Sequence, residues 1–139
     1  MPFKLLKPLA PAKERRLGRL SRMCFQAALK AMEQARFEIT DSSRVGIVVG
    51  TAHGAISLLD KFDRRIVAEG ILGTSPILFS NSVHNCVSSF ISLALGINGP
   101  STTIVNTELS TASAIERANS WLNDDIVDHV IVVVGDELN

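Results

Sequence analysis

The chain has 139 residues, of which 46% are hydrophobic, and its mean hydropathy is +0.24, which is enough for one domain with a real core. No apolar run approaches the roughly 20 residues that span a bilayer, and residues 1–11 lack the apolar centre of a signal peptide. We therefore expect no transmembrane segment. Cys24 and Cys86 follow neither a metal-ligand spacing nor a disulfide pattern, which favours the reducing cytoplasm.

The formal net charge is zero, but nine of the 14 basic residues and two of the 14 acidic residues precede Phe37. Such a basic segment can attract an acidic protein, an anionic membrane or nucleic acid, or it can be the solvated face of a helix. The solvated face is the favoured interpretation. Nucleic acid is the least favoured partner, because one tryptophan and no tyrosine supply no stacking platform.

In chain order, two prolines close a lead segment over residues 1–12, and residues 13–139 read as one domain. Apolar residues at three-and-four spacing predict a helix over 13–36. The run RVGIVVGT at 44–51 predicts a strand that is buried on both faces. A second helix is predicted over 54–68.

A loop over residues 70–76 follows, and a third helix is predicted over Cys86–Leu95. Asn85 is the expected N-cap of this helix, and Gly96 is expected to end it. The turn at Gly99 and Pro100 then leads into the next strand.

The remaining residues predict a strand over Thr102–Asn106, a helix over Ser110–Asn123 and a strand over His129–Gly135. Strands separated by helices imply crossover connections, so the fold class is α/β with a mostly parallel sheet covered by helices. Three strands are fewer than the usual five or six, so something else must cover an edge of the sheet.

The segment GTAHGA at 50–55 joins a strand to a helix, but it lacks both phosphate-loop spacings, so we predict a tight turn there. The three histidines, His53, His84 and His129, are too scattered for a metal set, and we expect neither metal nor cofactor. Asp136 and Glu137 follow the last strand, where α/β proteins bind ligands. Solvated acids remain the favoured interpretation.

Cys86 is the candidate for a reactive thiol, because amide groups at the first turn of a helix can lower a thiol pKa. Core packing is the favoured role, since a buried free cysteine commonly behaves as a small apolar side chain.

The segment NCVSSFISLALGINGPSTTIVNTELSTASAIERA, at 85–118, resembles the stretch around the nucleophile of β-ketoacyl-ACP synthases, in the thiolase-like superfamily. In that family an asparagine opens a helix, a GxxGPS turn follows, and a strand ends in Thr-Ala-Cys-Ser. The cysteine starts the next helix. GINGPS stands at 96–101 here, and the position matching the nucleophile is Leu109.

RVGIVVGTAHG and SRMCFQAALKAMEQARF are similar to the family's preceding strand and helix, so the resemblance covers about 16–139. It implies the amino-terminal half of a thiolase-like fold, incomplete relative to the full family fold. FSNSVHN at 79–85 and the closing VVVGDEL most resemble the group encoded in aryl polyene and dialkylresorcinol pathways. That group includes chain-length-factor-like subunits.

The resemblance implies that the chain has no catalytic residue. Leucine at position 109 has no nucleophilic atom, and the family's catalytic histidines belong to a carboxyl-terminal half that this chain does not contain. We therefore expect a noncatalytic, chain-length-factor-like subunit that acts with an active synthase in fatty acid, polyene or polyketide biosynthesis. Its expected partner is such a synthase or a second copy, in a dimer.

By the same resemblance, the candidates for the partner interface and acyl tunnel are Ser82, His84, Asn85, Cys86, Thr103, Ile104, Asn106, Glu108 and Leu109. The candidates for docking an acyl carrier protein are Arg15, Arg16, Arg19 and Arg22. Two alternatives remain: a stand-alone carrier-protein-binding module, and an acyl-transfer enzyme that uses Cys86 or Ser110 with His84 as the base.

Overall fold

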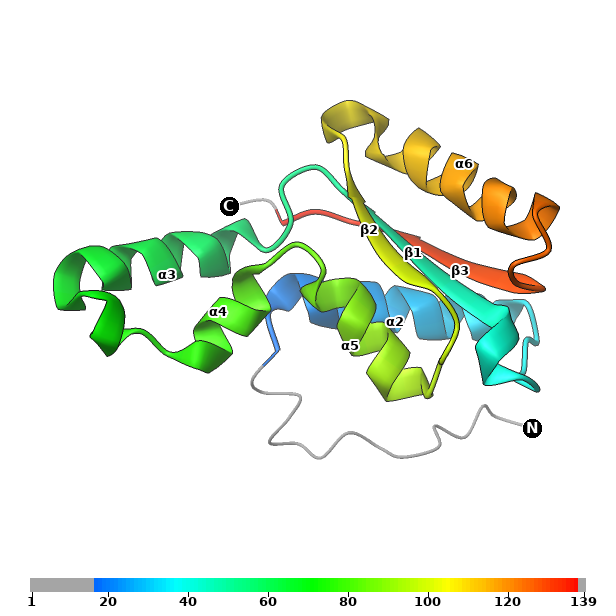
Figure 1. Cartoon of the computed structure of the whole chain (residues 1–139), viewed down its shortest axis with the longest axis horizontal. Coiled ribbons are helices and arrows are strands. Elements are labelled where there is room, and N and C mark those ends of the chain that lie inside the picture. The colour runs from blue at the N-terminus through cyan, green and yellow to red at the C-terminus, as the bar shows by residue number, and fades with distance from the viewer. Residues whose placement is uncertain (1–16, 138–139) are drawn as a thin grey trace.

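The computed structural model describes residues 17–137, so the lead segment, Arg15 and Arg16 lie outside the described residues. The described residues include three short 3-10 turns, at Ser42–Arg44, Ile71–Gly73 and Thr107–Leu109. Within 17–137, no helix is long and apolar enough to cross a membrane. The helices are α2 (Arg19–Gln34), α3 (Ile56–Glu69), α4 (Pro76–Ser82), α5 (Cys86–Leu95) and α6 (Ser110–Asn123), and the strands are β1 (Val45–Thr51), β2 (Ser101–Val105) and β3 (His129–Val134) (Figure 1).

The three strands form one parallel sheet in the order β2-β1-β3. Val49 of the central strand pairs with Thr103 on one side and with Val133 on the other. All seven residues of β1 are buried, as its unbroken apolar run predicts for a strand covered on both faces. The predicted α/β class with a parallel sheet is confirmed.

Helices cover both faces of this sheet (Figure 1). On one face, α2 and α5 bury side chains such as Leu20 and Ile91 in one core cluster with Ile47. On the other face, α6 packs Ala114 and Ala118 against Val48. Gly50 allows this close approach, because an added Cβ would lie 2.8 Å from the Ser110 carbonyl oxygen.

Helices α3 and α4 form a helical arm (residues 56–82) that extends away from the sheet (Figure 1). They pack on each other, with the rings of Phe62 and Phe79 5.5 Å apart, and no residue of α3 is buried. The turn between them leaves Ile71 and Leu72 exposed to solvent.

Two sequence expectations need correction. Helix α4 was not predicted; it has seven residues, starts at a proline and is too short to show a helical period. Asn85 does precede α5, but its side chain makes no capping hydrogen bond. Gly96 ends α5 in the left-handed conformation, with φ of 68°, as predicted.

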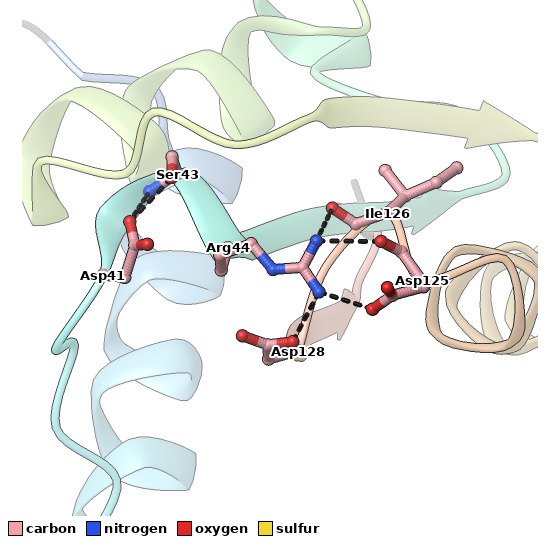
Figure 2. Close-up of polar contacts among 6 residues, drawn as sticks. All are labelled: Asp41, Ser43, Arg44, Asp125, Ile126 and Asp128. Carbon is pink, nitrogen blue, oxygen red and sulfur yellow. Dashed lines mark hydrogen bonds and ion pairs between the residues drawn. The ribbon is translucent and has the colours of Figure 1, made fainter.

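Arg44 joins the start of β1 to the turn between α6 and β3 (Figure 2). Its Nη1 donates to the carbonyl oxygens of Asp125 and Ile126, at 2.8 and 3.2 Å. Its Nη2 donates to the carboxylates of Asp125 and Asp128, each at 2.6 Å, and the second of these bonds lowers the pKa of Asp128. These contacts fix the entry of β3 beside β1, which gives Arg44 a structural role.

Candidate functional site

The carboxyl ends of the three parallel strands meet at one edge of the sheet. Beyond this edge lie the turn after Thr51, the 3-10 turn over 107–109 and the residues that follow Val134. Open parallel sheets bind ligands at this edge, and the sequence candidates around Leu109 lie here.

Leu109 is presented outward at the amino-terminal end of α6, and 61% of it is exposed. The preceding turn is tight: Thr107 has φ of +42°, a region that non-glycine residues seldom adopt. Asn106 steadies the turn, since its side-chain amide donates to Ser113 Oγ at 2.9 Å. A cysteine at position 109 would have its thiolate stabilised by helix amides, but leucine offers no nucleophile.

Ser110 does not present a free hydroxyl at this site. The residue is buried, and its Oγ donates toward the carbonyl oxygens of Thr51 and Thr107, both at 2.8 Å. It also accepts from the backbone amide of Asn106 at 3.0 Å. This geometry disfavours Ser110 as a nucleophile. Its hydrogen bonds connect the turn over 107–109 to β1.

Cys86 does not have the lowered thiol pKa that a reactive cysteine would need. Burial is the largest effect and raises the pKa, outweighing the Ser21 hydroxyl, 3.7 Å from the sulfur, and the nearby backbone amides, which lower it. Burial likewise raises the pKa of Cys24 to about 11. Both cysteines are free and buried, as the core-packing interpretation predicted. His84 is exposed and lies against Gly54.

The turn after β1 binds the chain's own carboxylate. Asp136 accepts from the Thr51 hydroxyl at 2.7 Å and from the backbone amides of Ala52 and His53, each at 2.8 Å at closest. The amides that a phosphate would need are therefore already satisfied, in agreement with the predicted tight turn. Burial alone would raise the pKa of Asp136, but these hydrogen bonds outweigh it and lower the pKa.

Asp136→Asn is expected to destabilise the fold by about 2 kcal/mol at pH 7, because charge-assisted hydrogen bonds are lost. The side-chain NH2 group of asparagine would also face the backbone amides of the turn, to which it cannot hydrogen bond. The carboxyl group has a lower pKa in the folded state than the value of about 3.9 in the unfolded state, so its ionisation stabilises the fold fully at pH values above this unfolded-state pKa. This stabilisation disappears as the pH falls through the pKa of the folded state. In urea unfolding, the difference in free energy of unfolding between wild type and the variant should therefore shrink as the pH is lowered. The exposed Asp124→Asn is the control, and an equal loss in both variants would contradict the assignment.

Glu137 is buried rather than solvated, so the expectation of two solvated terminal acids is wrong. Its Oε1 accepts from the Leu20 amide at 2.9 Å, near the start of α2. Its Oε2 accepts from the amide and the hydroxyl of Ser57, near the start of α3. One carboxylate thereby satisfies the first turns of two helices. Its partners lie 117 and 80 positions away, so no local sequence pattern could reveal them.

The interface candidates separate into buried and accessible groups. Ser82 and Cys86 are buried within this chain, so they contribute to packing. Asn85 and Thr103 line one groove of about 490 Å³ between α5 and β2, whose outer edge pairs with no other described strand. Thr103 Oγ1 donates to Ser88 Oγ at 3.0 Å, inside that groove. Thr103 and Ile104 are half-buried, and Ile104 packs toward α6. The exposed candidates are His84, Asn85, Asn106, Glu108 and Leu109.

Arg19 and Arg22 are both exposed on α2, which fits either a solvated face or a docking surface. No group of three or more potential metal ligands occurs among residues 17–137.

The chain belongs to the β-ketoacyl synthase family, because residues 5–138 match the model of the family's N-terminal domain. It is 28% identical over 106 residues to the chloroplastic 3-oxoacyl-(acyl-carrier-protein) synthase I of Arabidopsis thaliana, covering 73% of this chain and 21% of that enzyme. It is also 28% identical over 88 residues to 3-oxoacyl-(acyl-carrier-protein) synthase 2 of Vibrio harveyi, an alignment that covers 62% of this chain and 20% of that enzyme. The chain thus spans about a fifth of these relatives.

Two solved structures share the fold. The ishigamide ketosynthase/chain length factor superposes with a TM-score of 0.82 at 19% identity, covering 99% of this chain and 39% of that one. The ketosynthase of Xenorhabdus doucetiae in complex with its chain length factor gives a TM-score of 0.74 at 18% identity, and the superposition covers 97% of this chain and 52% of that one. The predicted family is confirmed, and the fold is that of half of such a subunit.

Proposed function

We propose that this chain is a noncatalytic, chain-length-factor-like subunit that pairs with an active ketosynthase in fatty acid, polyene or polyketide biosynthesis. The observation that carries the proposal is Leu109. The turn and helix that would present a nucleophile are both formed, and the side chain they present cannot accept an acyl group. The free cysteines suit a reducing cytoplasm.

Among the strands of residues 17–137, β2 is paired on one side only, and its other edge supports a dimeric role. An exposed edge strand offers a row of hydrogen-bonding groups that a partner strand can satisfy. The groove between α5 and β2 lies beside that edge. Partners solved with relatives of this fold include a chain length factor bound to its ketosynthase. We place the partner at the β2 edge.

Carrier-protein docking is the second part of the proposal. Arg19 and Arg22 project into solvent from α2, and an acidic carrier helix would be attracted to such a surface in a salt-sensitive manner. Arg15 and Arg16, the other two docking candidates, precede them in the sequence and lie outside the described residues. The acyl-transfer alternative gains no support, because the Cys86 thiol is buried and the Ser110 hydroxyl is already hydrogen bonded.

A condensation assay tests the proposal. The purified chain, given acyl and malonyl carrier proteins, is expected to form no covalent acyl adduct and no product by mass spectrometry. Adding it to a candidate ketosynthase is expected to raise product formation or change the product's length. Acylation of the chain alone would contradict the noncatalytic assignment. If the chain changed neither the amount nor the length of the product of any tested ketosynthase, the subunit role would be contradicted.

A further inference from the structure

A pocket of about 290 Å³ lies between the start of α2 and the two helices of the arm. Its apolar lining includes Leu58 of α3 together with Ile77 and Leu78 of α4. Leu58 also packs against Gly18, which holds the base of the arm against α2. None of the pocket's residues lines the groove beside β2, so this is a separate feature of the chain.

Two cations line the same pocket. Lys61 and Arg65 are one helical turn apart on α3, and neither forms an ion pair with another residue in 17–137. Arg64, between them in sequence, is paired with Asp60 at 2.8 Å. Like charges four residues apart destabilise a helix, so an anion bound between Lys61 and Arg65 would relieve their repulsion.

We propose that this pocket binds an anionic amphiphile, with a carboxylate or phosphate head between Lys61 and Arg65 and a short apolar chain against Leu58, Ile77 and Leu78. Ser75 also lines the pocket, and its hydroxyl makes no capping bond to α4, so it is a further donor for the head. The pocket volume of about 290 Å³ is just below the roughly 300–1,000 Å³ of ligand pockets, so only a short apolar chain would fit.

The recognition has two separable parts. The cations attract the head, while the apolar residues exclude water from the chain, so a ligand with only one part is expected to bind weakly. A free fatty carboxylate and an alkyl phosphate ester both carry this chemistry. The inference does not depend on the proposed function, since the β2 edge contributes nothing to the pocket.

The test is a titration of the full ¹⁵N-labelled chain, followed by NMR, with octanoate in one arm and octyl phosphate in the other. Saturable shifts are expected in amides of residues 58–65 and 75–81 with at least one of them, and the tighter ligand identifies the preferred head. Octanol and inorganic phosphate are the matched controls, and each should bind at least about tenfold more weakly. Equal binding of either control, or no saturable shift in these residues, would overturn the proposal.

The double variant Lys61→Gln/Arg65→Gln should weaken binding of the preferred amphiphile by at least about tenfold. Arg64→Gln, on the same helix but paired with Asp60, is the matched control and should bind as wild type does. Thermal unfolding checks that each variant is folded. As a measure that needs no variant, rising sodium chloride should weaken binding of the amphiphile. Salt-independent binding would refute the role of the two cations.

Discussion

Thr103→Pro is expected to prevent the chain from pairing with a ketosynthase while leaving its own fold intact. Ile47 donates its amide to the Pro100 carbonyl, and Ile47 pairs with Ser101. In a parallel ladder this register turns the Thr102 and Ile104 amides toward β1 and the Thr103 amide toward the open edge. Proline at 103 therefore removes a donor that only a partner can use, and its ring obstructs the approaching strand.

The expected size of this effect is at least about a tenfold increase in the Kd of the complex, measured by titration calorimetry. Thr103→Val is the matched control, because it removes the hydroxyl bonded to Ser88 but keeps the outward amide, so its affinity should stay near that of wild type. Ile104→Pro removes an amide that faces β1 and is expected to disrupt the fold itself. A complex of unchanged affinity with folded Thr103→Pro would show that the partner does not bind at β2.

Leu109→Cys is expected to convert a chain with no accessible thiol into one with a single fast-reacting thiol. The native cysteines are buried, and at pH 8 a thiol with the pKa of Cys24, about 11, is about 0.1% ionised. Position 109 is exposed and lies at the start of α6, where helix amides favour a thiolate. Its alkylation by iodoacetamide should be at least about 100-fold faster than that of either native cysteine.

Mass spectrometry of the native, folded chain measures the labelling. One adduct on Leu109→Cys and none on wild type is the expected pattern, with Cys86→Ala in the Leu109→Cys background confirming the labelled site. Rapid labelling of wild type at Cys86 would support the alternative of an acyl-transfer enzyme that uses this cysteine. Slow labelling of Leu109→Cys would mean that the turn over 107–109 does not present its last side chain to solvent.

The strands and most helices could be predicted because each carries a local pattern. RVGIVVGT predicts a strand buried on both faces, and β1 is buried along its whole length. The three-and-four spacing predicted a helix over 13–36, and α2 is described over Arg19–Gln34, with Leu20, Cys24 and Ala28 buried. Helix α4 escaped prediction because seven residues span too few turns to show a period.

The candidate site could be predicted only in part. The turn that carries Leu109 was identifiable by resemblance, whereas the binding of Asp136 to the Thr51–His53 turn depends on residues more than 80 positions apart. Burial also decided the state of Cys86, and burial follows from α2 packing over α5 rather than from the sequence near the cysteine. The sequence does not indicate a shared site for Lys61 and Arg65, because their pocket exists only once α4 folds back on α3.

The most direct test of the central claim is the molar mass of the chain in solution, measured by light scattering alone and mixed with a candidate ketosynthase. The subunit role predicts a complex whose mass equals that of the ketosynthase protomer plus one chain of 15.0 kDa, or a dimer of the chain when it is alone. A folded 15.0 kDa monomer that stays monomeric with every tested ketosynthase and salt concentration would contradict it.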